Sequence, residues 1–170
     1  MAVIGKSVLK GIKVHLTFDE IQFCQIYGRM RSLVSRGNNV VDAKMGDHDG
    51  ADADVMGFMG ELAFAKHFNV YPDIGLSPKS GTPDGVFKGN RYDIKSTERP
   101  DGRLLCTLKD NPDVDLYVLC VVKAPIVEIK GWAYKSELVR QENLINLGYG
   151  DGYGLKQSQL RQFQEVKNER

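Results

Sequence analysis

The chain has 170 residues, of which 42% are hydrophobic and 26% are charged, and its formal net charge is +1. These values fit a single globular domain that buries about two thirds of its unfolded surface. The near-neutral charge argues against a strongly basic protein that binds DNA regardless of sequence. No apolar run reaches the roughly 20 residues of a membrane-spanning helix. Three widely spaced cysteines predict reduced thiols in the cytoplasm, without a disulfide frame or a zinc site.

The first part of the chain predicts a strand, a helix and a loop. Alternating apolar side chains over residues 10–16 indicate a short strand. Thr17 and Glu20 have the spacing of a capping box, which marks the start of a helix. The helix is expected to end near Gly37, and its apolar residues recur at helical spacing: Ile21, Cys24, Tyr27, Met30, Leu33 and Val34. Residues 37–53 are polar and rich in Gly and Asp, which predicts a mobile loop.

A second helix is predicted over residues 54–68. Gly57 and Gly60 each lower its helix propensity by about 1 kcal/mol relative to Ala, so we expect them to permit close approach to a sheet or a ligand. Glu61 follows these glycines. A lone helical glutamate is usually a solvated charge. However, Glu61 and Lys66 do not have the i, i+4 spacing of a pair on a helix surface, so local pairing does not explain this residue.

Five strands are predicted next, at residues 83–88, 91–97, 103–108, 116–123 and 126–134. The run from Asp115 to Val122 is continuously apolar after its first residue, which is typical of a buried central strand. A short helix is expected at residues 135–140. The Gly/Tyr-rich stretch from Gly148 to Gly154 is expected to be a loop.

The strands at 83–88 and 91–97 predict a β-hairpin that carries acidic side chains. Gly89 and Asn90 suit a two-residue turn, because both residues tolerate positive φ. This turn would pair Asp84 with Lys95, and it would pair Val86 with the second aspartate of the hairpin, Asp93. Side chains along a strand alternate between the two faces of a sheet, so the residues of the hairpin divide into two sets. One face would carry Asp84, Val86, Asp93 and Lys95, and the core face would carry Phe87, Tyr92 and Ile94.

Asp84 and Asp93 would then lie close enough to share a cation, since neighbouring Cβ atoms across an antiparallel pair are about 4.5–5.5 Å apart. Hard divalent cations prefer carboxylate oxygens, and Lys95 could orient a water molecule bound to such an ion. The alternative is an exposed Asp–Lys pair that contributes about 0–1 kcal/mol. The triplet Asp93-Ile94-Lys95 alone favours this alternative, so the flanking sequence has to decide.

The order of Glu61, Pro83-Asp84 and Asp93-Ile94-Lys95, together with the flanking strands, resembles the PD-(D/E)XK nuclease superfamily. The similarity covers about residues 54–140. Residues 1–53 show no such similarity and form a strand–helix extension of one domain over residues 1–170. The chain also looks like the small stand-alone members found in phages. The resemblance implies an α/β fold with a restriction-endonuclease-like core, in which helices flank a central mixed β-sheet.

The resemblance also implies a role for each motif position. Glu61, Asp84 and Asp93 would ligate Mg²⁺ or Mn²⁺ together with the backbone carbonyl of Ile94. Lys95 would orient or deprotonate the attacking water and steady the charge on the phosphate. The expected catalytic residues are therefore Lys95, Asp84, Asp93 and Glu61.

The implied function is hydrolysis of DNA phosphodiester bonds by a metal-dependent nuclease. DNA would be the partner, in a bacterial cell or a phage-infected host, with no membrane involved. A homodimer would supply the two centres that cutting both strands requires. The alternative function is a non-catalytic nucleic-acid-binding or assembly protein on the same fold. The competent side chains at all four motif positions favour the enzyme.

Two further groups of residues suit contact with a nucleic acid. Ser96 and Thr97 follow the motif and could donate to a phosphate, although a simple role at the end of a strand fits them equally well. Tyr149, Tyr153 and Lys156 could meet nucleotides by stacking and charge. A loop packed by its own tyrosines fits the same residues, so both alternatives stay open for each group.

Overall fold

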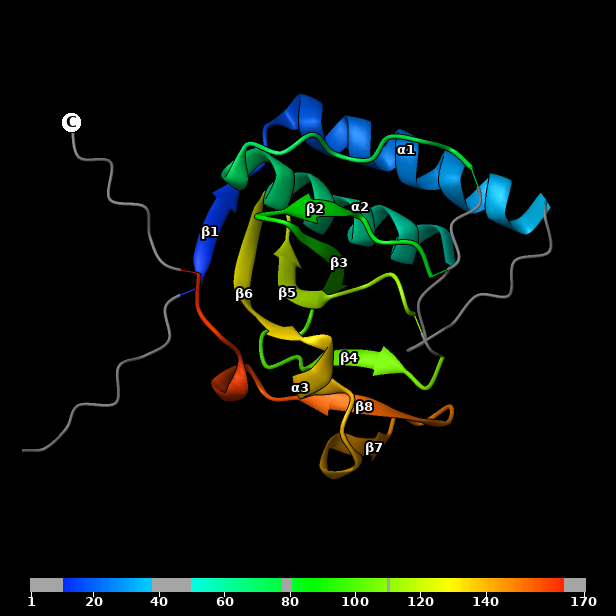
Figure 1. Ribbon diagram of the computed structural model, residues 1–170. Coiled ribbons are helices and arrows are strands. Elements are labelled where there is room, and N and C mark those ends of the chain that lie inside the picture. The colour runs from blue at the N-terminus through cyan, green and yellow to red at the C-terminus, as the bar shows by residue number, and fades with distance from the viewer. Residues whose placement is uncertain (1–10, 38–49, 78–80, 110, 164–170) are drawn as a thin grey trace, which may run out of the picture.

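The computed structural model describes residues 11–37, 50–77, 81–109 and 111–163 (Figure 1). The strands are β1 (Ile12–His15), β2 (Gly85–Phe87), β3 (Asn90–Thr97), β4 (Leu104–Thr107), β5 (Leu116–Lys123), β6 (Ile126–Tyr134), β7 (Leu144–Asn146) and β8 (Asp151–Leu155). The helices are α1 (Phe18–Gly37), α2 (Gly50–Phe68) and α3 (Lys135–Leu138), with 3-10 turns η1 (Gln141–Asn143) and η2 (Gln157–Gln159). Within these ranges, no helix has the length and apolar character that crossing a bilayer would need.

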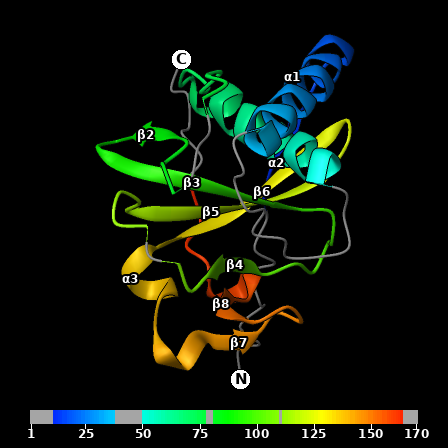
Figure 2. The same cartoon turned by 90° about the vertical axis from the view of Figure 1, so that its right-hand side faces the viewer.

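The strands form two sheets, one of five strands in the order β1-β6-β5-β3-β2 and one of three strands in the order β4-β8-β7. In the larger sheet β3 and β5 are parallel, and the other neighbours are antiparallel. Helices α1 and α2 cover one face of this sheet, and α3 and the smaller sheet lie on the other side (Figures 1 and 2). The predicted class, a mixed sheet flanked by helices, is confirmed.

Strand β5 lies in the middle of the larger sheet and is buried on both faces. Val118 and Cys120 belong to the apolar core beneath α2, whereas Tyr117 and Leu119 belong to the core between the two sheets. The apolar run that predicted a central strand therefore reflects two separate cores. The other strands predicted before residue 135 are confirmed with ends shifted by a few residues at most.

Helix α1 begins at the predicted capping box. The backbone N–H of Thr17 donates to Glu20 Oε2 over 2.7 Å, and the N–H of Glu20 donates to Thr17 Oγ1 over 3.2 Å. Helix α2 begins at Gly50, four residues earlier than expected. Asp52 lies in its first turn, where a carboxylate favours helix formation. The end of the predicted loop over 37–53 is thus helical, and residues 38–49 lie outside the described residues.

Helix α2 lies close against β3 because Gly60 faces the sheet. A Cβ atom added at Gly60 would overlap the Ser96 hydroxyl, and it would lie 3.2 Å from Ile94 Cγ2 and 3.3 Å from Cys120 Cβ. Gly57 faces open space, with nothing within 4 Å of an added Cβ. The predicted close approach to a sheet is therefore confirmed for Gly60, whereas Gly57 makes no such approach.

The hairpin turn lies one residue earlier than predicted. Its central residues are Lys88 and Gly89, with φ of 48° and 78°, instead of Gly89 and Asn90. Positive φ at both positions defines the turn type that suits a two-residue hairpin, and Asn90 Nδ2 donates to the carbonyl of Lys88 over 3.2 Å. Val86 therefore opposes Arg91, two residues from its predicted partner. An even shift keeps the paired side chains of β2 and β3 on their predicted faces, whereas Asp84 lies just before the paired residues.

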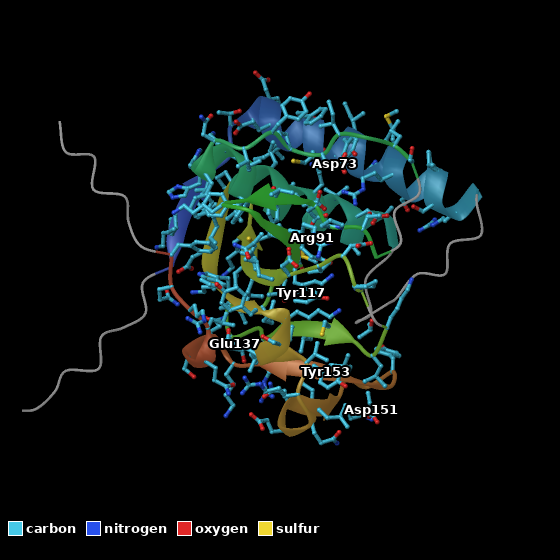
Figure 3. The ribbon with its side chains drawn as sticks, in the orientation of Figure 1. Asp73, Arg91, Tyr117, Glu137, Asp151 and Tyr153 are labelled. Carbon is cyan, nitrogen blue, oxygen red and sulfur yellow. The ribbon has the colours of Figure 1, made fainter. Side chains whose placement is uncertain are left out.

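The parallel pairing of β3 and β5 starts at an ion pair. Arg91 donates through Nε and Nη2 to the two carboxylate oxygens of Asp115, over 3.0 and 2.9 Å, and its backbone N–H donates to the same carboxylate over 2.8 Å. The hydrogen bonds from Arg91 lower the pKa of Asp115 to about 2. Arg91 is labelled in Figure 3. This pair fixes the register of β3, the strand that carries Asp93 and Lys95.

The Gly/Tyr-rich stretch was wrongly predicted to be a loop, because its second half is strand β8, which pairs with β4 and β7. A Cβ atom added at Gly152 would lie 2.5 Å from Leu147 Cδ1, and one added at Gly154 would lie 2.5 Å from Ile145 Cδ1. Glycine is rare in strands because it supplies no side chain for packing. Here the neighbouring leucine and isoleucine supply that packing instead.

The contact of Gly60 with the sheet predicts opposite effects for two glycine substitutions. Gly60→Ala should lower the free energy of unfolding by about 1–3 kcal/mol, because its Cβ would push α2 away from β3. The matched change Gly57→Ala should raise it by about 0.5–1 kcal/mol through helix propensity alone. Equilibrium urea unfolding of both variants measures the difference. Similar effects at the two positions would contradict the close contact at Gly60.

Candidate functional site

Asp84 lies just before β2 and is held over the middle of β3 by backbone hydrogen bonds. Its Oδ2 accepts a hydrogen bond from the backbone N–H of Ile94 over 2.7 Å. Its own N–H donates to the carbonyl of Tyr92 over 2.8 Å. The carboxylate and the backbone of Asp84 are thus both bonded to β3, which leaves the side chain little freedom to move away from that strand.

The charges of the other predicted site residues act on Asp84. Desolvation raises the pKa of Asp84 well above its usual range, and the negative charges of Glu61 and Asp93 raise it further. The Ile94 amide and Lys95 partly counteract this rise. The hydrogen bond from Ile94 places the Asp84 carboxylate next to the segment of β3 that carries Asp93 and Lys95. The charge of Glu61 also acts on Asp84.

Asp93 and Lys95 form an ion pair on the face of β3 that is turned away from α2. Lys95 Nζ lies 2.8 Å from Asp93 Oδ1, and Asp93 is buried. Desolvation alone would lower the pKa of Lys95, but the charges of Asp93 and Asp84 outweigh it and raise the pKa. The ammonium group also lies 5.7 Å from the ring centroid of Tyr117, labelled in Figure 3. Lys95 is thus held as a cation beside two carboxylates.

Glu61 is held by Arg31, a residue that the sequence analysis did not single out. Arg31 Nη1 donates to the two carboxylate oxygens of Glu61 over 3.0 and 3.1 Å. The guanidinium carbon lies 5.8 Å from the ring centroid of Tyr27. Desolvation would lower the pKa of Arg31, but the charge of Glu61 outweighs it and raises the pKa. Arg31 therefore remains charged although it is partly buried.

The sequence contains one feature that could have drawn attention to Arg31 as a buried charge. The residue lies on α1, outside residues 54–140, and no local motif surrounds it. It does follow Cys24 and Tyr27 at helical spacing, on the face that the structure buries. A charged residue on a buried helix face needs a partner. That partner, Glu61, becomes visible only when α1 packs against α2.

The donor set fits a divalent cation in kind and in charge. Carboxylate oxygens are the ligands that Mg²⁺ prefers, and the three carboxylates outnumber the two cationic side chains. In the described part of the chain, no group of three or more His, Cys, Asp or Glu side chains lies close enough to hold a metal ion. Two of the carboxylates bind cations of the chain instead, Glu61 to Arg31 and Asp93 to Lys95. Glu61 would have to turn away from Arg31 to join a shared ion.

The two residues after the motif lie on opposite faces of β3. The hydroxyl of Ser96 is buried beneath Gly60, on the side of α2, and it finds no hydrogen-bond partner among the residues that the structure describes. Thr97 shares the face of Lys95, and its Oγ1 accepts a hydrogen bond from the N–H of Arg99 over 3.2 Å. Thr97 alone thus lies on the side where Lys95 would meet a phosphate.

The second group of residues that could contact a nucleic acid also differs in exposure, between Tyr153 on one side and Tyr149 and Lys156 on the other. Tyr153, labelled in Figure 3, lies on β8 and packs against the core between the sheets. Tyr149 is 66% exposed, and Lys156 is exposed as well. The packing alternative therefore holds for Tyr153. Tyr149 and Lys156 remain accessible to a ligand.

Comparisons with known proteins do not identify a family for this chain. A scan against protein-family models, a search of curated proteins and a search of solved structures returned no match to this chain. What the residues can do must therefore be argued from their positions and charges.

The crowding of negative charge predicts that Asp84 weakens the fold. Asp84→Asn should raise the free energy of unfolding by about 1 kcal/mol or more in EDTA, because it removes one of three neighbouring negative charges. The exposed Asp101, whose side chain is 81% accessible, offers the matched control Asp101→Asn, which should change little. Urea unfolding at neutral pH measures both. A less stable Asp84→Asn protein would contradict the repulsion.

Proposed function

We propose that this chain is a metal-dependent DNA nuclease with the restriction-endonuclease-like core of the PD-(D/E)XK superfamily. The observation that carries the proposal is that the Asp84 carboxylate accepts the N–H of Ile94, the residue between the paired Asp93 and Lys95, while the charge of Glu61 also acts on it. A buried carboxylate with a strongly raised pKa beside a lysine and two further acids marks a functional site more often than a structural one. An ordinary Asp–Lys ion pair on the protein surface would not need two further carboxylates beside it.

The order of the elements supports the same core. Helix α2 carries Glu61 and packs on the sheet through Gly60. The hairpin of β2 and β3 carries Asp84, Asp93 and Lys95, and β5 then pairs parallel to β3. A helix followed by a hairpin within a mixed sheet is the part of the expected core that this order matches, whereas the second helix expected before the next strand does not occur among the described residues between β3 and β5. In the proposal, each motif residue keeps the role expected for it.

In the proposed reaction, Glu61, Asp84 and Asp93 would hold Mg²⁺ or Mn²⁺ with the backbone carbonyl of Ile94. When bound, the ion would lower the pKa of a water molecule and neutralise charge on the phosphate. Lys95 contributes a fixed positive charge that orients the attacking water or stabilises the developing charge on a phosphate oxygen. One hydrogen bond to the carboxylate of Asp84 and one from its backbone N–H would keep this residue in place while substrate enters.

Arg31 has a double role in this proposal. It neutralises Glu61 in the metal-free protein through bonds to both carboxylate oxygens. Once Glu61 turns to the ion, the guanidinium is released next to the site, where it can contact a phosphate through paired N–H donors. DNA is accordingly the proposed partner, and a homodimer would supply one centre for each strand.

A non-catalytic nucleic-acid-binding protein is the second candidate function. The observation in its favour is that Glu61 and Asp93 are already bonded to cations of the chain. A site that is permanently neutralised in this way would bind a phosphate backbone without needing a metal ion. Binding that EDTA does not weaken, with no cleavage, would distinguish this function.

The nuclease proposal predicts metal-dependent cleavage that depends on two residues of β3. Linear, circular, branched and single-stranded DNA should be tested with Mg²⁺, Mn²⁺ or EDTA. Asp93→Ala and Lys95→Ala should each lower the cleavage rate by about 10²–10³-fold or more. The controls are Asp151→Ala and Lys123→Ala, exposed residues of β8 and β5, which should cleave normally. Absence of cleavage of every substrate by the wild-type protein would refute the nuclease.

The double role of Arg31 predicts tighter metal binding when it is removed. Arg31→Met should increase Mn²⁺ affinity about three- to tenfold, because Glu61 is freed and the site gains net negative charge. Arg29→Met on the exposed face of α1 makes the same change of charge without contact to Glu61 and should have a much smaller effect. Electron paramagnetic resonance of free Mn²⁺ measures both affinities. Weaker binding in Arg31→Met would show that Arg31 only orients Glu61.

A further inference from the structure

Helix α1 exposes a line of large apolar side chains on its outer side, and Phe23, at one end of the line, also packs against Phe58 of α2 with ring centroids 5.6 Å apart. Phe23 is 42% exposed, Ile26 62%, Met30 44% and Leu33 70%. The opposite face is already buried against α2, through residues such as Tyr27. A surface helix of a globular protein normally carries polar residues on its outer face. A second apolar face therefore needs a partner of its own.

The spacing of these four residues is that of a helix–helix seam. They follow one another at intervals of three, four and three positions, which places them in a single line along the helix. The line is also symmetric: Phe23 and Leu33 lie equally far from position 28, and so do Ile26 and Met30. In an antiparallel pair of identical helices, each of these residues therefore opposes another apolar residue of the set.

The charges at the ends of α1 favour the same antiparallel arrangement. Asp19 and Glu20 lie in the first turn and Arg36 lies in the last turn. Glu20 is bonded to Lys66 over 2.8 Å, so Asp19 is the acid on the exposed side. An antiparallel copy brings its Arg36 close to Asp19, and it also sets the two helix dipoles in opposition. A parallel copy would instead place like charges together.

We propose that α1 is the interface of a homodimer in which two copies pair their α1 helices antiparallel, around a two-fold axis near Gly28. Such an interface is self-complementary, as a two-fold axis requires. Gly28 itself faces inward, where an added Cβ would lie 2.6 Å from Val55 Cα. Arg29 lies beside the seam near the axis, and its long exposed side chain can extend into solvent.

The proposed interface leaves the candidate site free. Arg31 binds Glu61 on the inner side of α1, whereas the apolar line lies on the outer side. Pairing through α1 would thus place one site on each side of the helix pair. The inference does not depend on the nuclease chemistry, because its test measures molecular mass. A monomer that cleaves DNA would overturn the dimer alone, and a dimer without cleavage would leave the interface standing.

Sedimentation equilibrium of the full chain from about 2 to 200 µM tests the interface. The wild-type protein should show the mass of a dimer at the higher concentrations. Ile26→Asp and Leu33→Asp should each raise the dissociation constant about tenfold or more, because each would bury an unpaired carboxylate. Leu108→Asp, at a residue that is 55% exposed outside α1, should leave the mass unchanged. Circular dichroism checks that each variant is folded.

Disulfide trapping tests the register independently. Oxidation of a mixture of Ile26→Cys and Met30→Cys chains should give mainly linked pairs of the two different chains. The native thiols of Cys24, Cys106 and Cys120 are buried and should not interfere. Linkage mainly between identical Ile26→Cys chains would indicate a parallel pair and overturn the proposal.

Three other results would also overturn the proposed interface. The first is a wild-type protein that stays monomeric over the whole concentration range. The second is a dimer that survives both aspartate substitutions in folded form. The third is a monomer that dimerises only after deletion of residues 1–10, which would show that the chain's own N-terminal segment occupies the apolar line.

Discussion

The close contact between Gly60 and β3 determines where the other parts of the candidate site lie. A side chain at this position would overlap Ser96, so only glycine lets α2 approach the sheet this closely. Glu61 is the next residue and therefore reaches the acids of the hairpin. A second close contact, between Gly28 of α1 and the backbone of α2, brings Arg31 to Glu61. Two glycines thus set the spacing of both helices above the sheet.

Electrostatic repulsion is the main cost of this arrangement. Desolvation and the charges of Glu61 and Asp93 disfavour the charged form of Asp84, and the Ile94 amide and Lys95 offset only part of this effect. A fold selected for stability alone would place apolar or neutral residues there. A divalent cation would offset this repulsion, because all three carboxylates would be attracted to the ion. The same charges that weaken the metal-free protein would then bind the ion.

Most of the fold followed from local patterns, and the exceptions have tertiary causes. The alternation of side chains along a strand was enough to predict that Asp93 and Lys95 lie on one face of β3. This prediction holds although the turn was misplaced, because the register of the hairpin shifted by two residues. The turn itself was misplaced because Lys88 adopts positive φ beside Gly89, which no propensity favours. The position of Arg31 depended on how two helices pack, which periodicity within one helix cannot reveal. The strand β8 was missed because its partners, not its own residues, fill the space.

The central claim is that one divalent ion can bring three carboxylates together at the edge of the sheet. Crystals soaked in Mn²⁺, with anomalous diffraction data, test it most directly. The account predicts one ion within about 2.1–2.2 Å of oxygens from Glu61, Asp84 and Asp93, with Arg31 released from Glu61. An ion bound elsewhere, or the absence of an ion while Glu61 stays bonded to Arg31, would contradict it.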